Sequence, residues 1–332
     1  MLVKGRRRLW LVSFLSSFFI GLTLIIYLFY SLESNSRQRT HLPAELEEKF
    51  GAATGEYWID GAFFRFSIVD GIGVAAYHSL KAICPAFDDF NECKKLFKSK
   101  LHINRTFVSW VYGPGIIRCA RLLDVCFFRV EGSNENFTPE TGEEKRQQSV
   151  YLKLLTQDRT SSDDYIIGNL VSKRRVFTLF KIPSRPGYSG SPLLNEEGKP
   201  LAIAVTGGSI SLNVLTLLGF LDKDSSYKFF RSYTSGVSFH IVSKLAACYR
   251  EGDEACWQQT IQTAWNYLQD DFRDLKDSPS ATGDFLLEYR NLKEFIRRGC
   301  EDYRDHNPLI VQDLALMEPE VVLNQCAIAL RK

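Results

Sequence analysis

Hydrophobic residues in the first two thirds of the chain form short runs that are separated by turn-forming residues. The runs at 57–59, 62–69 and 73–76 are separated by Asp60-Gly61 and Asp70-Gly71, and Asp-Gly is a dipeptide typical of β-hairpins. Further runs occur at 106–112, 122–128, 149–155, 165–168, 175–180, 201–205, 214–220 and 236–242. The pattern predicts a mainly β fold built from short antiparallel strands.

The C-terminal part of the chain follows a different pattern. From about residue 244 onwards, apolar residues recur at intervals of three and four, which is the spacing of an amphipathic helix. A polar segment at 278–283, which contains Pro279 and Gly283, interrupts this pattern. We therefore expect residues 248–332 to form an α-helical appendage whose apolar stripes pack against the β fold or against each other.

A third pattern lies near the N-terminus, where residues 9–32 include no charged side chain. About 20 apolar residues span a bilayer as a helix, so this segment predicts a transmembrane signal anchor. A cleaved signal peptide fits less well, since its apolar region is usually about 7–15 residues long. Basic residues cluster in residues 1–8, and the positive-inside rule then places that end in the cytosol. The sequence predicts a single-pass membrane protein whose remaining chain is lumenal or extracellular, with residues 33–55 as a stalk.

Composition narrows the classes of function. Hydrophobic residues make up 45% of the chain and charged residues 24%, which is typical of a globular protein. The net charge of +2 argues against a dedicated nucleic-acid surface. No cluster of metal ligands or phosphate-binding loop stands out, so we expect neither a metal nor another cofactor. The oligomeric state stays open.

Cysteines and sequons fit the predicted topology. The chain has eight cysteines, an even number that suits disulfide formation in an oxidising compartment. The sequence leaves their connectivity open, and several of them are alternatively reduced core residues. Among close neighbours in sequence, the pairs that we considered are Cys84 with Cys93, Cys248 with Cys256, and Cys300 with Cys326. Asn104 and Asn136 begin sequons and are expected glycosylation sites on the lumenal or outer side.

Three segments carry candidate chemistry. The segment 187–194 places Ser189 in a Gly-Tyr-Ser-Gly sequence, and glycines allow a tight turn whose amides converge beside a serine hydroxyl. His78 follows an apolar strand, and Asp124 stands at the start of another. The order His, Asp, Ser excludes the α/β-hydrolase arrangement, in which the serine comes first. Successive members are 46 and 65 residues apart.

These motifs resemble those of the chymotrypsin-like serine peptidases, especially the compact HtrA-type and viral Gly-x-Ser-Gly branches. The resemblance implies two six-stranded antiparallel β-barrels in residues 56–247 and a triad of His78, Asp124 and Ser189. It also implies that the backbone amides of Gly187 and Ser189 form an oxyanion hole. The chain departs from trypsin in having Tyr188 before the serine, so activation through a newly cleaved N-terminus is not expected.

The resemblance also assigns a substrate-binding region. It implies contributions from Thr206, Gly207, Gly208, Gly236, Ser238 and His240. No carboxylate occupies these positions, so a trypsin-like preference for Arg or Lys is not supported. His240 either favours acidic or amide substrate side chains or is an ordinary histidine on a core strand.

We therefore predict a membrane-anchored serine endopeptidase that hydrolyses peptide bonds of protein substrates through an acyl-enzyme. The C-terminal region lacks the strands of a PDZ domain, which departs from the HtrA pattern. One alternative is a viral peptidase that processes a polyprotein. Another is a catalytically inactive protein of the same fold that binds a partner.

Overall fold

The computed structural model describes residues 38–40, 42, 44–59, 62–83, 101–103, 106–108, 117–130, 148–153, 165–182, 187–208 and 233–277, and positions 21, 288, 292, 295 and 296. Apart from Gly21, which is helical, the predicted anchor at 9–32 lies outside this part of the chain. The sequons at Asn104 and Asn136 also lie outside it. Among the described residues, no helix is both long and apolar enough to cross a bilayer.

The C-terminal half of the β fold is a closed barrel of six antiparallel strands. Its strands, in order of pairing, are β9 (Ser149–Lys153), β10 (Tyr165–Lys173), β11 (Phe177–Lys181), β14 (Tyr233–Ser238), β13 (Pro200–Gly208) and β12 (Pro192–Leu194). The barrel closes because β9 pairs with both β10 and β12. One of the two predicted six-stranded barrels is thus confirmed.

The N-terminal half is a second sheet of seven strands, which differs from the six-stranded barrel that we predicted. Its strand order is β6 (Thr106–Val108), β5 (Leu101–Ile103), β2 (Thr54–Ile59), β3 (Ala62–Val69), β4 (Ile72–Ala76), β8 (Val125–Arg129) and β7 (Arg118–Ala120). Among the described residues its edge strands β6 and β7 do not pair, so we call it the open sheet. The hairpin predicted at Asp70-Gly71 is present, and both residues have positive φ, as a type I′ turn requires.

Part of the predicted stalk belongs to the fold. Strand β1 (Gln38–Thr40) pairs with β10 at the barrel, and helix α2 (Ala44–Ala52) leads directly into β2. The low apolar periodicity that suggested a stalk arises because β1 has only three residues and gains its stability from pairing with β10. The described residues 38–40 and 44–55 are therefore part of the structured domain.

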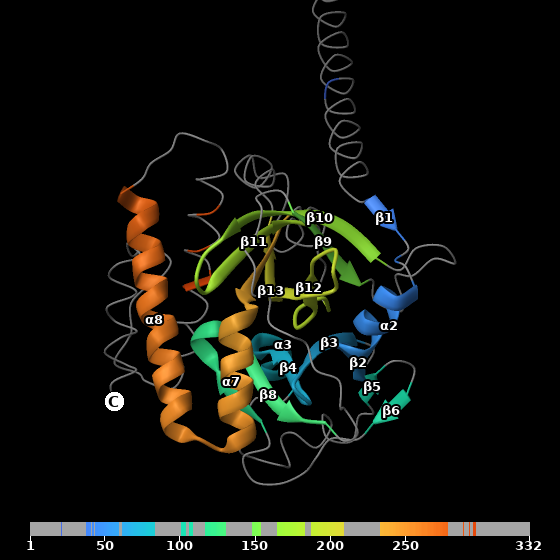
Figure 1. Ribbon diagram of the computed structural model, residues 1–332, viewed down its shortest axis with the longest axis horizontal. Coiled ribbons are helices and arrows are strands. Elements are labelled where there is room, and N and C mark those ends of the chain that lie inside the picture. The colour runs from blue at the N-terminus through green and yellow to red at the C-terminus, as the bar shows by residue number, and fades with distance from the viewer. Residues whose placement is uncertain are drawn as a thin grey trace, which may run out of the picture.

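Two helices follow the barrel and lie along one side of both sheets (Figure 1). Helix α7 (Phe239–Glu251) starts directly after β14, and α8 (Glu254–Asp277) follows the left-handed Gly252. The predicted strand at 236–242 is therefore wrong beyond Ser238. The helical prediction for the C-terminal region is confirmed for α8, although α7 begins nine residues before the expected boundary at 248.

The helices share one hydrophobic core with the barrel and the open sheet. This core contains Val74 and Phe127 from the open sheet, Leu179 and Ile203 from the barrel, and Leu245 and Trp265 from the helices. The Phe127 ring also meets the Trp257 ring edge-on, with 5.4 Å between centroids. The helices are thus integrated into the core, which is more than the appendage that we expected.

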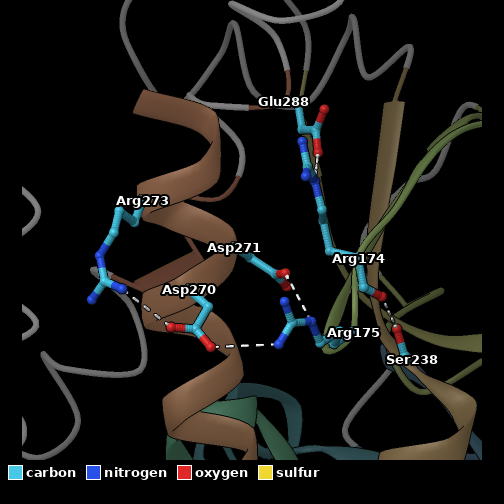
Figure 2. Close-up of polar contacts among 7 residues, drawn as sticks. All are labelled: Arg174, Arg175, Ser238, Asp270, Asp271, Arg273 and Glu288. Carbon is cyan, nitrogen blue, oxygen red and sulfur yellow. Dashed lines mark hydrogen bonds and ion pairs between the residues drawn. The ribbon is translucent and has the colours of Figure 1, made fainter. Parts of the chain in front are cut away.

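Polar contacts also join α8 to the turn between β10 and β11 (Figure 2). Arg175 lies 3.4 Å from Asp270 and 3.9 Å from the buried Asp271, and Arg174 pairs with Glu288 at 2.5 Å. Burial raises the pKa of Asp271 to about 6, against the lowering effect of the two arginines.

Two disulfides occur in the described part of the chain. Cys248–Cys256 joins α7 to α8 and is one of the pairings we considered. Cys119–Cys126 joins the antiparallel neighbours β7 and β8 and was not among them. The other four cysteines, at 84, 93, 300 and 326, lie outside the described residues.

Candidate active site

Strands β4 and β8 bring His78 and Asp124 together. The apolar strand β4 ends at Ala76, and a short helix, α3 (Tyr77–Lys81), turns His78 out of the sheet. Asp124 immediately precedes β8. Because Ala76 pairs with Val125, the start of α3 with His78 lies beside Asp124. The Tyr77 amide donates to the Asp124 carbonyl at 3.0 Å and secures this junction.

The carboxylate of Asp124 binds His78 through both of its oxygens. Oδ1 accepts from the His78 amide at 2.9 Å, and Oδ2 lies 2.6 Å from His78 Nδ1. A carboxylate accepts only, so Nδ1 carries the proton and Nε2 of the neutral ring is an acceptor. The Asp124 side chain is 10% exposed, whereas that of His78 is 43% exposed. The carboxylate is thus shielded, and the imidazole faces solvent.

Ser189 reaches His78 from the other half of the molecule. Its Oγ lies 3.1 Å from His78 Nε2 and 3.4 Å from the carbonyl oxygen of Val205. The register of β13 against β14 shifts between Ala204 and Thr206, so Val205 sits at a bulge. Bulges commonly redirect a strand beside a site, and this one turns the carbonyl toward the serine.

The loop that carries Ser189, residues 187–191, is held by its own backbone and by the neighbouring strand. The Gly190 amide donates to the Ala204 carbonyl at 2.7 Å, and the Ser191 amide donates to the Tyr188 carbonyl at 3.0 Å. Gly187 and Gly190 have φ values of 96° and 94°, which glycine adopts without strain. The amides of Gly187 and Ser189 donate to no group among the described residues.

The loop also contacts the open sheet directly. Ser67 Oγ on β3 donates to the Gly190 carbonyl at 2.7 Å. A Cβ at Gly190 would lie 2.2 Å from the Arg65 carbonyl oxygen, so only glycine fits there. The structure thus joins the sheet of His78 and Asp124 to the loop of Ser189 beside the three side chains.

The predicted substrate-binding residues fall into two groups. Thr206, Gly207 and Gly208 continue β13 directly beyond Val205, whose carbonyl contacts Ser189, so Thr206 is the nearest of the three along the strand and Gly208 the farthest. Gly236 lies opposite Ala204, and a Cβ there would meet the Ile203 carbonyl oxygen at 2.6 Å. Tight strand packing therefore accounts for this glycine.

Ser238 and His240 lie beyond Gly236 along the chain, farther from the contact between Val205 and Ser189. Ser238 pairs with Ala202, three positions or roughly 10 Å along β13 from Val205. Its buried hydroxyl bonds to Thr178 and to the Arg174 carbonyl, which is a structural role. His240 lies on the exposed face of α7. The pKa of the His240 imidazole is lowered, first by partial burial and then by the positive charge of Lys173 at the end of β10.

Sequence reasoning missed Arg65 and Glu56, which are buried and paired next to this site. The available signal was a single arginine in the otherwise apolar run of β3, opposite an acid on β2. Charged residues are almost never fully buried unless they are paired. Within the described residues no group of three or more His, Cys, Asp or Glu side chains is arranged to hold a metal ion.

Comparisons with known proteins give only distant structural likeness. No protein-family model matches the chain. No curated protein matches its sequence. Among solved structures, a serine-to-alanine mutant of Rv3671c from M. tuberculosis in an inactive form has a TM-score of 0.43 at 7% identity, covering 65% of this chain and 98% of its own. Inactive and active forms of the Rv3671c protease each have a TM-score of 0.40 at 8% identity.

These two forms cover 61% and 60% of this chain, and 92% and 82% of their own chains respectively. At such scores the interpretation of the site rests on the geometry of this chain itself.

Proposed function

We propose that the chain is a chymotrypsin-like serine endopeptidase that hydrolyses peptide bonds through His78, Asp124 and Ser189. The observation that carries this proposal is the continuous contact from Asp124 Oδ2 to His78 Nδ1 at 2.6 Å and from His78 Nε2 to Ser189 Oγ at 3.1 Å. A hydroxyl, an imidazole and a carboxylate in this sequence are the parts of an activated nucleophile.

The geometry supports a defined sequence of steps. Ser189 Oγ attacks the carbonyl carbon of a peptide bond while His78 Nε2 accepts the hydroxyl proton. The resulting imidazolium returns that proton to the amine as the carbon–nitrogen bond breaks, which leaves an acyl-serine. Water then attacks the ester in the same way and restores the hydroxyl. Asp124 keeps the ring in the reactive tautomer and stabilises its protonated form.

The amides of Gly187 and Ser189 complete the proposed site. A tetrahedral intermediate carries a negative oxygen beside the serine, and preorganised N–H donors at that point commonly contribute about 100- to 1000-fold in turnover. Thr206, Gly207 and Gly208 follow Val205, which contacts Ser189, at the end of β13 and are the proposed contacts of the substrate backbone.

The membrane topology remains part of the proposal. The uncharged segment at 9–32 and the basic residues before it support an anchor with a cytosolic N-terminus. The Cys119–Cys126 and Cys248–Cys256 disulfides suit a lumenal or extracellular domain. Translation with microsomes should add glycans at Asn104 and Asn136, and removal of both sequons should abolish the mobility shift. Unshifted, protease-accessible protein would contradict this topology.

A fluorophosphonate probe tests the proposed activity without knowledge of the substrate. The intact folded protein should be labelled, and Ser189→Ala should abolish labelling, whereas Ser243→Ala on α7 should leave it unchanged. Asp124→Asn should slow labelling by about 10⁴-fold, because the ring loses its orienting carboxylate. Absence of labelling in folded wild-type protein would favour the alternative of an inactive binding protein.

The viral alternative is a polyprotein-processing peptidase. Expression with additional flanking sequence would reveal autocatalytic cleavage that depends on Ser189. Peptide-library profiling of the labelled enzyme would then define its sequence preference.

A further inference from the structure

Arg65 is a charged residue at the centre of β3, with a relative exposure of 0%. Burying a guanidinium is costly unless a counter-charge and hydrogen bonds compensate it. Glu56 lies directly opposite on β2, and its Oε1 accepts from Arg65 Nη2 at 2.5 Å. The Glu56 carboxylate offsets part of this cost, and the other contacts of the guanidinium indicate what else it holds in place.

The guanidinium reaches from the open sheet to the barrel. Its Nη1 donates to the Lys153 carbonyl at the end of β9. Its central carbon lies 5.5 Å from the centroid of the buried Tyr188 ring, within the range of a cation–π contact. A single side chain therefore holds one strand of the barrel and the residue that directly precedes Ser189.

The backbone of Arg65 contacts the residue on the other side of Ser189. Its carbonyl oxygen lies so close to Gly190 that no Cβ fits between them, and Ser67, two residues along β3, donates to the Gly190 carbonyl. Residues 188 and 190 are thus both held by this stretch of β3. Ser189 itself is fixed between them.

The location of the three reactive side chains makes this support important. His78 and Asp124 both belong to the open sheet, so their contact depends on the pairing of β4 with β8. Ser189 belongs to the barrel, and its 3.1 Å contact with His78 depends on how the two halves dock. A contact between the two halves next to the loop that carries Ser189 therefore helps to set the distance from Ser189 Oγ to His78 Nε2, across which the proton is transferred.

We propose that Arg65 is a positioning residue that fixes the nucleophile loop, residues 187–191, against the open sheet. This inference rests on the proposed peptidase function. Arg65 acts through Tyr188 and Gly190 and does not touch the substrate. Misplacement of a reacting group by about 1 Å can lower a rate by about 100-fold. Removal of Arg65 therefore slows attack by Ser189, while substrate binding at Thr206, Gly207 and Gly208 is unaffected.

The test separates positioning from folding with three variants. Arg65→Lys keeps the charge but cannot bind Glu56 and Lys153 together. Arg65→Met leaves Glu56 as an unpaired buried charge, and adding Glu56→Gln removes that charge so that the double variant folds. The matched control is Arg174→Met with Glu288→Gln, which removes an ion pair at the distant β10–β11 turn (Figure 2).

The measurement is saturation kinetics of a fluorophosphonate probe, with thermal unfolding as the check on folding. In this reaction Ser189 Oγ forms a bond to phosphorus, fluoride leaves, and His78 takes the proton. Arg65→Lys and the Met/Gln double variant should lower the limiting rate by about 10- to 100-fold and leave the half-saturating concentration unchanged. The control pair should keep the wild-type rate.

Two outcomes overturn the inference, and they are distinguishable. A folded double variant that reacts at the wild-type rate would show that Arg65 does not position the loop, while the peptidase proposal would stand. A folded wild-type protein that does not react at all would overturn both.

Discussion

Asp124 and Gly190, both near the candidate site, have positive φ for different physical reasons. Asp124, with φ of 55°, ends a short 3₁₀ helix (Arg121–Leu123), and aspartate tolerates this region because its side chain bonds locally. Gly190, with φ of 94°, lies where a side chain would collide with β3. The first conformation aims a carboxylate at His78, and the second lets the two halves of the molecule approach each other.

Gly190→Ala should therefore disrupt the docking of the loop. Its Cβ would lie 2.2 Å from the Arg65 carbonyl oxygen, and backbone atoms at such a contact must move. We expect a loss of stability of about 2–4 kcal/mol, from strain and displaced backbone, with labelling slowed at least tenfold. Chemical denaturation and fluorophosphonate labelling measure the two effects.

Gly252→Ala is the matched control for this prediction. Gly252 also has positive φ, 69°, but nothing lies within 4 Å of its added Cβ. The control should lose only about 1 kcal/mol of stability, because a side chain disfavours positive φ, and should be labelled at the wild-type rate. Equal effects of the two substitutions would contradict a role for close packing at Gly190.

The contact among His78, Asp124 and Ser189 was predictable at this scale, whereas its support was not. His78, Asp124 and Ser189 stand in local motifs, so the sequence alone pointed to side chains that the structure brings into contact. Arg65 and Tyr188 are 123 positions apart along the chain, and only the docking of two sheets brings them together. Such a contact leaves no local pattern.

At the scale of elements, the junction of β14 and α7 shows why periodicity failed. The residues Phe239, Ile241 and Val242 are all buried, which suits either a strand or the first turn of a helix. A short apolar run does not separate these alternatives. The helix forms because α7 continues with buried Leu245, Ala246 and Tyr249 at helical spacing against the shared core.

Helix α8 contributes a pH-dependent contact with the β10–β11 turn. Asp271 has a folded-state pKa of about 6, above its ordinary value near 3.8, chiefly because burial disfavours the carboxylate. The folded state then binds more protons than the unfolded state between about pH 4 and 6. Stability from this group is fully present below about pH 4 and is lost as the pH rises to about 6.

Asp271→Asn should remove that dependence. The variant should gain stability relative to wild type as the pH rises from about 4 to 6, by up to about 3 kcal/mol, and the difference should then stay constant. Denaturation at a series of pH values measures it. Asp270→Asn, at the more exposed neighbour that also pairs with Arg175, should change stability by less than about 1 kcal/mol at every pH. A flat difference for Asp271→Asn would contradict the assignment.

At the scale of the whole molecule, α8 connects the two halves of the β fold. Trp257 packs on Phe127 of the open sheet, and Arg118 of β7 lies 4.1 Å from the centroid of the Trp257 ring. At its other end, Asp270 and Asp271 meet Arg175 beside the barrel. Helical periodicity in the sequence predicted an amphipathic helix but did not indicate which surface it covers, because either sheet offers an apolar face. The contacts show that it covers both.

Trp257→Ala should accordingly destabilise the whole domain by about 3–5 kcal/mol, since a buried aromatic side chain and its contacts are lost. Unfolding should remain one cooperative transition, because the largest core cluster includes residues of both sheets and of the helices. The folded fraction should still react with a fluorophosphonate at the wild-type rate, since Trp257 does not contact the three reactive side chains. Calorimetry and labelling at low temperature provide the measurements.

Gln259→Ala, on the exposed side of the same helix, is the control and should change stability by no more than about 0.5 kcal/mol. A truncated chain that ends at Gly252 extends the test. It should expose Phe127 and the other apolar side chains that α8 now covers, and so bind a hydrophobic dye. If the truncated chain instead unfolds cooperatively and reacts at the wild-type rate, α8 is an independent appendage. The two halves would then dock without α8, through α7 and through the contacts of Arg65 and Ser67 with residues 187–191.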